Sequence, residues 1–215
     1  MRQGLPHQNY KDKRVKLAIF ASGNGSNFSA ILKAIKQGRI KTGLVVLVCD
    51  KPEARVISRA KKAKAAVILV KREDFASRPD FEAAIIQRLK NYKIELIALA
   101  GFMRMLSPSF VRKYRNRVMN IHPSLLPAFK GSHAIKDALE AAAHFTGVTV
   151  HFVDEEMDHG PVILQQKVRI TSRDTLASLE KRIHSIEHKL YPQAIRLFSE
   201  GRIKIKGGKV ETSNP

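Results

Sequence analysis

Short apolar runs alternate with longer amphipathic segments along the first half of the chain. The amphipathic segments predict helices over Ser26–Gln37, Glu53–Lys64 and Asp80–Lys90, because their apolar residues recur on one helical face. The apolar runs predict strands over Leu17–Phe20, Leu44–Cys49, Ala65–Val70, Leu96–Ala100 and Val118–Ile121. Strands that alternate with helices in this way favour right-handed βαβ crossovers and a mostly parallel sheet.

The pattern changes in the second half of the chain. Gly147–Val153 alternates apolar and polar residues, and Val162–Ile170 follows too closely for a crossover helix, so these two strands are expected to be antiparallel. Asp174–Glu200 has the apolar spacing of one long helix, which Pro192 can kink or divide. After this helix, Arg202–Lys206 predicts a small edge strand.

These elements predict a single α/β domain with a Rossmann-like open sheet, mostly parallel with an antiparallel C-terminal part, and helices on both faces. We expect the domain to cover residues 15–206 of the 215-residue chain, after a disordered arm over 1–14 and before a tail over 207–215. The first residues lack the apolar core of a signal peptide, and no span has the apolar length of a membrane helix. We therefore expect a cytoplasmic protein without a membrane partner.

Basic residues outnumber acidic ones: 39 Lys and Arg against 19 Asp and Glu give a formal net charge of +20. This charge predicts affinity for polyanions, which include nucleic acids and phosphorylated substrates. No basic run is interleaved with aromatic residues, however, so we expect no nucleic-acid partner. A basic nucleic-acid-binding α/β protein is the non-enzyme alternative, and it predicts steeply salt-dependent RNA binding. The single cysteine, Cys49, excludes an intrachain disulfide.

The first candidate site is the loop Ser22–Asn27, between the first predicted strand and the helix that follows it. Ligands of open parallel sheets bind at the carboxyl ends of the strands. There the glycines and the free N–H groups of a helix start can hold a phosphate. A dinucleotide site would require glycine in place of Phe28, although Asp50 could act as the acid that binds ribose, and a Walker loop is absent. A glycine turn before a capped helix is the structural alternative.

The second candidate site is the pair Asn120 and His122 at the end of the fifth predicted strand. Period-two alternation directs both side chains to one face of the sheet, and Pro123 keeps the backbone of His122 extended. An amide and an imidazole there suit the stabilisation of a developing oxyanion and the transfer of a proton. The acidic segment Asp154–Asp158 can supply a carboxylate that holds His122 protonated or accepts a proton through water. A solvated hairpin loop is the alternative interpretation of this segment.

Other chemistries find little support in the sequence. His184 and His188 have a spacing that can bind a metal, but no third ligand is evident, so a solvated helix face is preferred. Cys49 lies in an apolar run and no Gly-x-Ser-x-Gly motif occurs, so we expect no covalent nucleophile. We predict neither a metal nor a nucleotide cofactor.

Four segments, in their order and spacing, resemble the phosphoribosylglycinamide formyltransferases, a folate-dependent formyltransferase family. The segments are Ser22–Asn27, Ala100–Leu106, Asn120–Pro127 and Asp158–Gln165. The resemblance implies transfer of the formyl group of 10-formyltetrahydrofolate, as co-substrate, to the amine of glycinamide ribonucleotide in de novo purine biosynthesis. It further implies direct attack of the amine, a formylated ribonucleotide and tetrahydrofolate as products, and a monomer or homodimer.

The same resemblance assigns roles to individual residues. It implies that Asn120, His122 and Asp158 are catalytic, and that Glu187 contacts the glycinamide group. It implies that the substrate phosphate is bound by Gly25, Ser26 and Asn27. It implies that folate contacts Arg78, Met103, Arg104, Met105, Leu106, Asn120, Asp154, Glu155, Glu156, Met157 and Asp158.

Sister activities of the family are the enzymatic alternatives. Formyltetrahydrofolate deformylase and methionyl-tRNA formyltransferase usually carry a further domain, which we do not expect in a chain of this length, and sugar formyltransferases lack a specific supporting feature. The sequence also departs from the family pattern at Ile135, His159 and His184, where relatives often have His, a small residue and Gln. Since His159 follows Asp158, it is a candidate for perturbing the titration of that carboxylate.

Overall fold

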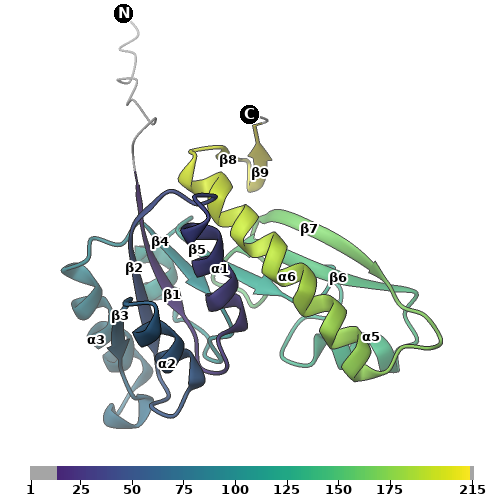
Figure 1. Ribbon diagram of the computed structural model, residues 1–215, viewed down its shortest axis with the longest axis horizontal. Coiled ribbons are helices and arrows are strands. Elements are labelled where there is room, and N and C mark those ends of the chain that lie inside the picture. The colour runs from purple at the N-terminus through teal and green to yellow at the C-terminus, as the bar shows by residue number, and fades with distance from the viewer. Residues whose placement is uncertain (1–13, 214–215) are drawn as a thin grey trace, which may run out of the picture.

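A seven-stranded sheet in the order β3-β2-β1-β4-β5-β6-β7 forms the centre of the computed structural model, which describes residues 14–213 (Figure 1). Neighbours from β3 to β5 pair in parallel, whereas β5–β6 and β6–β7 pair antiparallel. This confirms the predicted fold class. The strands are β1 (Val15–Phe20), β2 (Thr42–Cys49), β3 (Ala66–Leu69), β4 (Leu96–Leu99), β5 (Val118–His122), β6 (Phe145–Phe152) and β7 (Val162–Arg169).

Six α-helices connect or follow these strands among the described residues, and two of them, α4 and α5, are not predicted above. Pro192 lies inside α6 and does not divide it. Within the described part of the chain, none of the helices combines the length and apolar character needed to span a bilayer. The helices are α1 (Ser26–Lys36), α2 (Arg55–Lys62), α3 (Arg78–Lys90), α4 (Pro108–Lys113), α5 (Ala134–Glu140) and α6 (Leu176–Ser199), with a 3-10 turn η2 (Arg72–Asp74).

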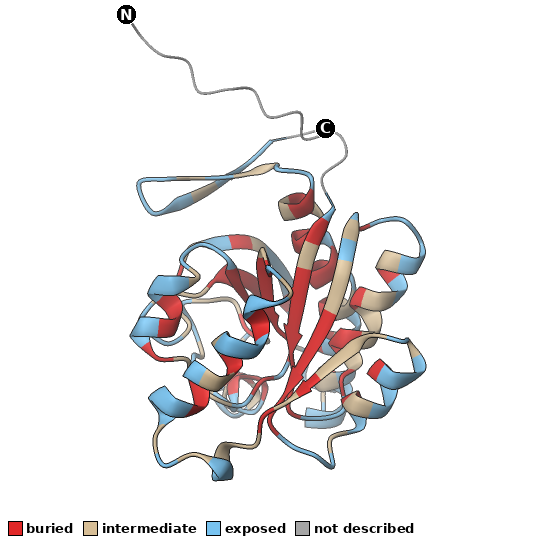
Figure 2. Cartoon of the chain, turned by 90° about the vertical axis from the view of Figure 1, so that its left-hand side faces the viewer, coloured by how far each residue is buried: buried red, intermediate tan, exposed pale blue. Residues whose placement is uncertain are grey.

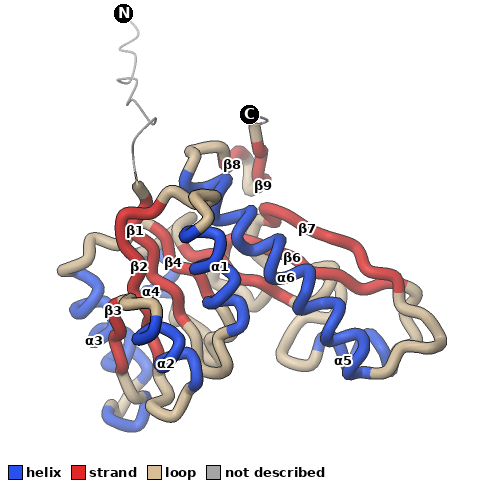
Figure 3. Tube along the Cα trace, viewed as in Figure 1, coloured by secondary structure: helices blue, strands red, loops and turns tan. Residues whose placement is uncertain are grey.

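The sheet is covered on both faces, and alternating strand residues contribute to two separate cores. Leu17 and Ile19 of β1 pack into a core with α1, α2 and α6, whereas Ala18 and Phe20 pack into another with α3 and α4. The helices α1 and α6 lie side by side across the first face (Figure 3). Figure 2 shows that buried residues follow the strands and the sheet-facing sides of the helices.

The C-terminal segment corrects two predictions. The predicted edge strand Arg202–Lys206 is observed as β8 (Ile203–Lys206), but β8 pairs with β9 (Lys209–Thr212) in a separate two-stranded sheet rather than with the main sheet. The predicted tail over 207–215 therefore contains a strand. Gly207 and Gly208 both have positive φ, which a tight hairpin turn of two residues requires. Residues 1–13 of the predicted arm and residues 214–215 lie outside the described residues.

Candidate functional site

A row of paired residues crosses four strands at the level where β4 ends. Phe20 pairs with Leu99, Leu99 with Asn120, and Asn120 with His151. Paired residues of neighbouring strands point to the same face of a sheet, so Asn120 and His151 share the face of the α3–α4 core. Over β5 and β6, the covering groups come from the loops that follow β5 and β6 rather than from a helix.

The carboxylate of Asp158 lies between the two polar side chains of β5. Its Oδ2 accepts a 2.9 Å hydrogen bond from the Gly131 N–H and lies 3.4 Å from His122 Nδ1. Its Oδ1 accepts a hydrogen bond from Asn120 Nδ2 at 3.4 Å. The Asp158 side chain is only 11% exposed. The structure thus brings Asn120, His122 and Asp158 together, although Asp158 is 38 residues from Asn120 in the sequence.

The His122 ring lies between the carbonyl oxygen of Phe129 and the carboxylate of Asp158, two residues with an unusual backbone conformation. Its Nε2 lies 2.8 Å from the carbonyl oxygen of Phe129, so Nε2 carries the hydrogen and donates it. Phe129 and Asp158 have φ values of 51° and 49°, in the left-handed region that costs a non-glycine residue about 1 kcal/mol or more. Backbone strain of this kind persists only where the surroundings determine it, and here it fixes both partners of one imidazole.

His151 is a member of the cluster that the sequence analysis missed. Its Nδ1 donates to the carbonyl oxygen of Phe152 at 2.8 Å, and its Nε2 therefore accepts from Asn120 Nδ2 at 3.3 Å. Burial lowers the pKa of His151, so the ring is neutral near pH 7 and can act as this acceptor. The sequence carries a signal for this residue in the alternation of β6. Val148 and Val150 face the core with α1 and α6, so Thr149 and His151 face the opposite side of the sheet.

The glycine loop before α1 has the features of an anion site. Gly25, with a φ of 73°, precedes the helix, and the first turn of α1 carries no acidic side chain. A Cβ on Gly25 would lie 2.5 Å from Val56 Cγ2, so only glycine fits here. Asn27 donates through Nδ2 to Glu187 Oε2 at 3.0 Å, and its buried Oδ1 has no hydrogen-bond partner among the described residues. The same Glu187 oxygen lies 3.0 Å from His184 Nδ1.

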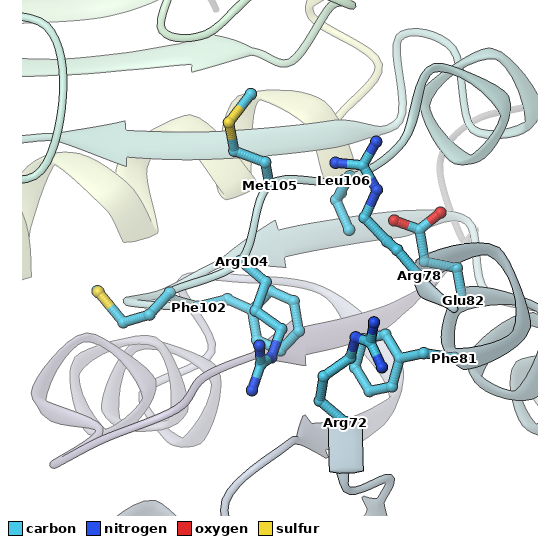
Figure 4. A pocket seen from close by; sticks show the side chains of 9 residues that line it. Arg72, Arg78, Phe81, Glu82, Phe102, Arg104, Met105 and Leu106 are labelled. Atoms are coloured by element: carbon cyan, nitrogen blue, oxygen red, sulfur yellow. The ribbon is translucent and has the colours of Figure 1, made fainter. Parts of the chain in front are cut away.

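A pocket of about 210 Å³ opens beside the loop that follows β4 (Figure 4). Arg104 is fixed at its rim, because its Nε lies 2.5 Å from Asp50 Oδ2 and its guanidinium lies over the Phe81 ring. Asp50 is therefore the partner of Arg104 and not an acid free to bind a ribose. The pocket is lined by the predicted Arg78, Met103, Arg104, Met105 and Leu106, together with Arg72, Phe81, Glu82 and Phe102, which were not predicted.

The other acidic residues of the 154–158 segment do not join the pocket. Asp154 Oδ2 lies 2.7 Å from His159 Nδ1, and Glu155 Oε2 lies 2.9 Å from Arg112 Nη1. The residues that line the pocket do not include Asp154, Glu155, Glu156 or Met157. The folate set predicted from sequence is thus divided between a pocket wall and a separate surface loop. Among the described residues, no group of three or more His, Cys, Asp or Glu has an arrangement that could hold a metal.

Comparisons with known proteins agree on one family. The family described as Formyl transferase matches residues 15–195. Phosphoribosylglycinamide formyltransferase of Bacillus subtilis (strain 168) is 45% identical over 181 residues, which are 84% of this chain and 93% of that protein. The enzyme of the same name from Escherichia coli (strain K12) is 39% identical over 191 residues, 89% of this chain and 90% of that protein. The crystal structure of glycinamide ribonucleotide transformylase 1 from Symbiobacterium toebii matches with a TM-score of 0.91 at 39% identity, covering 99% of both chains.

Proposed function

This chain belongs to the phosphoribosylglycinamide formyltransferase family of formyl transferases, and we propose that it transfers the formyl group of 10-formyltetrahydrofolate to the amine of glycinamide ribonucleotide. The observation that carries the proposal is the Asp158 carboxylate between Asn120 and His122, on the face of the sheet that also borders the pocket. In the reaction the amine nitrogen forms a bond to the formyl carbon, and the bond from that carbon to the folate nitrogen breaks. A proton passes from the amine to the departing nitrogen.

Asn120 and His122 supply hydrogen-bond donors where negative charge develops on the formyl oxygen. The donor Nε2–H of His122 is engaged by the Phe129 carbonyl, and we expect the formyl oxygen to replace that carbonyl. The amide of Asn120 makes contacts of 3.3 and 3.4 Å to its neighbours, which a stronger acceptor displaces readily. Asp158 faces Nδ1 of His122 and accepts the proton that the amine loses, before the proton reaches the leaving group.

The two substrates occupy different parts of the sheet edge. Gly25, Ser26 and Asn27 receive the substrate phosphate on the N–H groups that open α1, and Glu187 receives the glycinamide end. Folate lies against the pocket beside the β4 loop. The aromatic and aliphatic lining suits its ring system, and the cationic Arg72 and Arg78 suit its glutamate carboxylates.

This function involves small molecules as partners, and we infer a cytoplasmic location and a monomer or homodimer without nucleic acid. The net charge of +20 serves two anionic substrates but exceeds what their binding needs.

An acceptor assay tests the reaction directly. The protein is incubated with 10-formyltetrahydrofolate and, separately, with glycinamide ribonucleotide, methionyl-tRNA or no acceptor but water, and release of tetrahydrofolate is followed. We expect release that depends on glycinamide ribonucleotide alone. Equal release in water would identify a deformylase, and release with methionyl-tRNA would identify the tRNA-directed sister activity.

Variants of the central cluster test the assignment of roles. His122→Asn and Asp158→Asn should each lower kcat by about 10²-fold or more, because each removes a group that acts on the reacting atoms. The matched control is His144→Asn, since His144 is exposed and its backbone carbonyl, not its side chain, accepts a hydrogen bond from Ile170. Wild-type turnover in His122→Asn would overturn the assignment, provided that the control also retains wild-type turnover.

A further inference from the structure

A buried carboxylate lies next to the loop that would receive a phosphate. The Glu187 side chain is 6% exposed, and its Oε2 accepts the hydrogen bond from Asn27 at the start of α1. A negative charge at this place repels a phosphate dianion, because Coulomb interactions are strong where water is excluded. Binding of an anion beside Glu187 therefore calls for a compensating cation.

His184 is the cation paired with Glu187 among the described residues. Arg59 of α2 is a second cation at the loop, where it donates to Asn24 Oδ1 at 3.0 Å and to Ser29 Oγ at 3.2 Å, but its charge does not change with pH near neutrality. His184 Nδ1 lies 3.0 Å from the same Oε2 that Asn27 contacts, one helical turn before Glu187 on α6. No other Lys, Arg or His of the described residues forms a salt bridge with Glu187. The His184 side chain is 52% exposed, so the ring gains and loses its proton in contact with solvent. His184, Glu187 and Asn27 thus form a hydrogen-bonded chain from the surface of α6 to the glycine loop.

We propose that His184 is a positioning residue of the substrate site, which holds the Glu187 carboxylate against Asn27 and, when protonated, cancels the charge that would repel the substrate phosphate. The proposal deepens the function proposed above and rests on it. The proposal also gives a role to His184 as one of the three positions at which the sequence departs from the family pattern.

The surroundings of His184 favour its charged form. The hydrogen bond to Glu187 raises the pKa of His184 above its ordinary value, against the opposing effect of burial, and Glu180 on the same helix adds to the rise. His188 lies one turn further on, and burial lowers its pKa, so it carries little charge near pH 7. From α1, which packs against α6, the group beside the shared carboxylate is the uncharged Asn27 amide. No titratable group of α5, β6 or β7, which also pack against α6, contributes to the shift among the described residues.

The raised pKa of His184 sets the sign of the pH dependence of anion binding. Below the raised pKa His184 is charged and anion binding is at full strength, and as pH rises through that pKa the charge and its contribution are lost. The test uses ribose 5-phosphate, a phosphate monoester without an amine, and measures its dissociation constant by calorimetry between pH 7 and pH 9. The phosphate is already a dianion in this range, because its second pKa is about 6.

Three variants separate charge from geometry. Wild-type affinity should fall as pH rises through the raised pKa of His184, by up to about fivefold, the effect of one nearby unit charge. His184→Gln, which keeps a donor but no charge, should bind weakly at every pH, and His184→Lys should bind with nearly constant affinity. His188→Gln is the matched control on the same helix and should follow the wild type, because His188 is neutral at the start of the range.

Turnover distinguishes this role from a merely structural one. His184→Gln should raise KM for glycinamide ribonucleotide about fivefold at pH 7 and leave kcat nearly unchanged, since His184 does not touch the reacting atoms. A wild-type pH dependence of binding in His184→Gln overturns the inference, as does failure of the wild type to bind ribose 5-phosphate at pH 7. Failure of the proposed function would be recognised separately, by a different acceptor in the assay above.

Discussion

Replacement of Tyr191 by Phe tests how α6 is joined to the strands that carry the site. Tyr191 is fully buried, and its hydroxyl lies 2.9 Å from the carbonyl oxygen of Leu99 at the end of β4 and 2.9 Å from that of Met119 in β5. Met119 immediately precedes Asn120, so the hydroxyl joins the long helix to β5 next to the residues that form the candidate site. Phe fills nearly the same volume, and the substitution therefore removes hydrogen bonding without leaving a large cavity.

The expected loss follows from the hydrogen bond alone. One buried hydroxyl that donates to two carbonyl oxygens contributes about 1–2 kcal/mol net, because water would otherwise satisfy the same groups in the unfolded chain. For a protein of this size, that loss lowers Tm by about 2–8 °C. The assay is urea denaturation at 25 °C, followed by circular dichroism, with the free energy of unfolding compared between variant and wild type.

Tyr114→Phe is the matched control for this experiment. Tyr114 packs its ring against Phe110 and is half-buried, but its hydroxyl makes no hydrogen bond with the described residues. We expect its removal to change the free energy of unfolding by less than about 0.5 kcal/mol. If Tyr191→Phe were no more destabilising than Tyr114→Phe, the reasoning that the hydroxyl fastens α6 to β4 and β5 would be refuted.

Two further predictions concern the loops of the site. Gly25→Ala should raise KM for glycinamide ribonucleotide at least about tenfold, because the new Cβ would lie 2.5 Å from Val56 Cγ2 and distort the glycine loop that we propose as the phosphate site. Gly38→Ala, which shares the positive φ but has no atom within 4 Å of the new Cβ, should leave initial-rate kinetics near wild type, and equal defects in both would contradict the steric argument. His159→Gly should leave the pH–rate profile unchanged, because the exposed His159 pairs with Asp154 and not with Asp158. A shifted acid limb in that variant would restore the hypothesis that His159 perturbs the titration of Asp158.

Local patterns were sufficient for most of the fold. The strands and helices from β1 to β5 follow apolar runs and helical spacing that need no knowledge of the tertiary structure. The α-helices that local patterns do not predict are α4 and α5, which are short and bury only two and three residues, respectively. Helices of one or two turns depend on tertiary packing for their stability, so periodicity does not reveal them. The pairing of β8 with β9 was missed for a similar reason, since each strand is only four residues long.

Part of the candidate site was also predictable from local patterns, and part depended on tertiary contacts. Alternation along β5 was enough to put Asn120 and His122 on one face, and the glycine loop before α1 was recognisable from its composition. The pocket wall was found only in part, because Phe81 and Glu82 come from α3, and nothing local indicates that α3 faces the loop after β4. The sequence likewise leaves the role of Asp50 open, because its partner Arg104 is 54 residues away along the chain.

The sequence by itself determined which residues share a strand face, the approximate positions of α1, α2, α3 and α6, and that a chemically suitable set of side chains exists. Only the tertiary structure decided that Asp158, rather than Asp154 or Glu155, reaches His122, and that His151 lies opposite Asn120. The physical reason is the range of the forces. Propensity and periodicity act within a few residues along the chain, whereas contacts such as that between Asn120 and Asp158, 38 residues apart, depend on strand order, antiparallel register and the path of a loop.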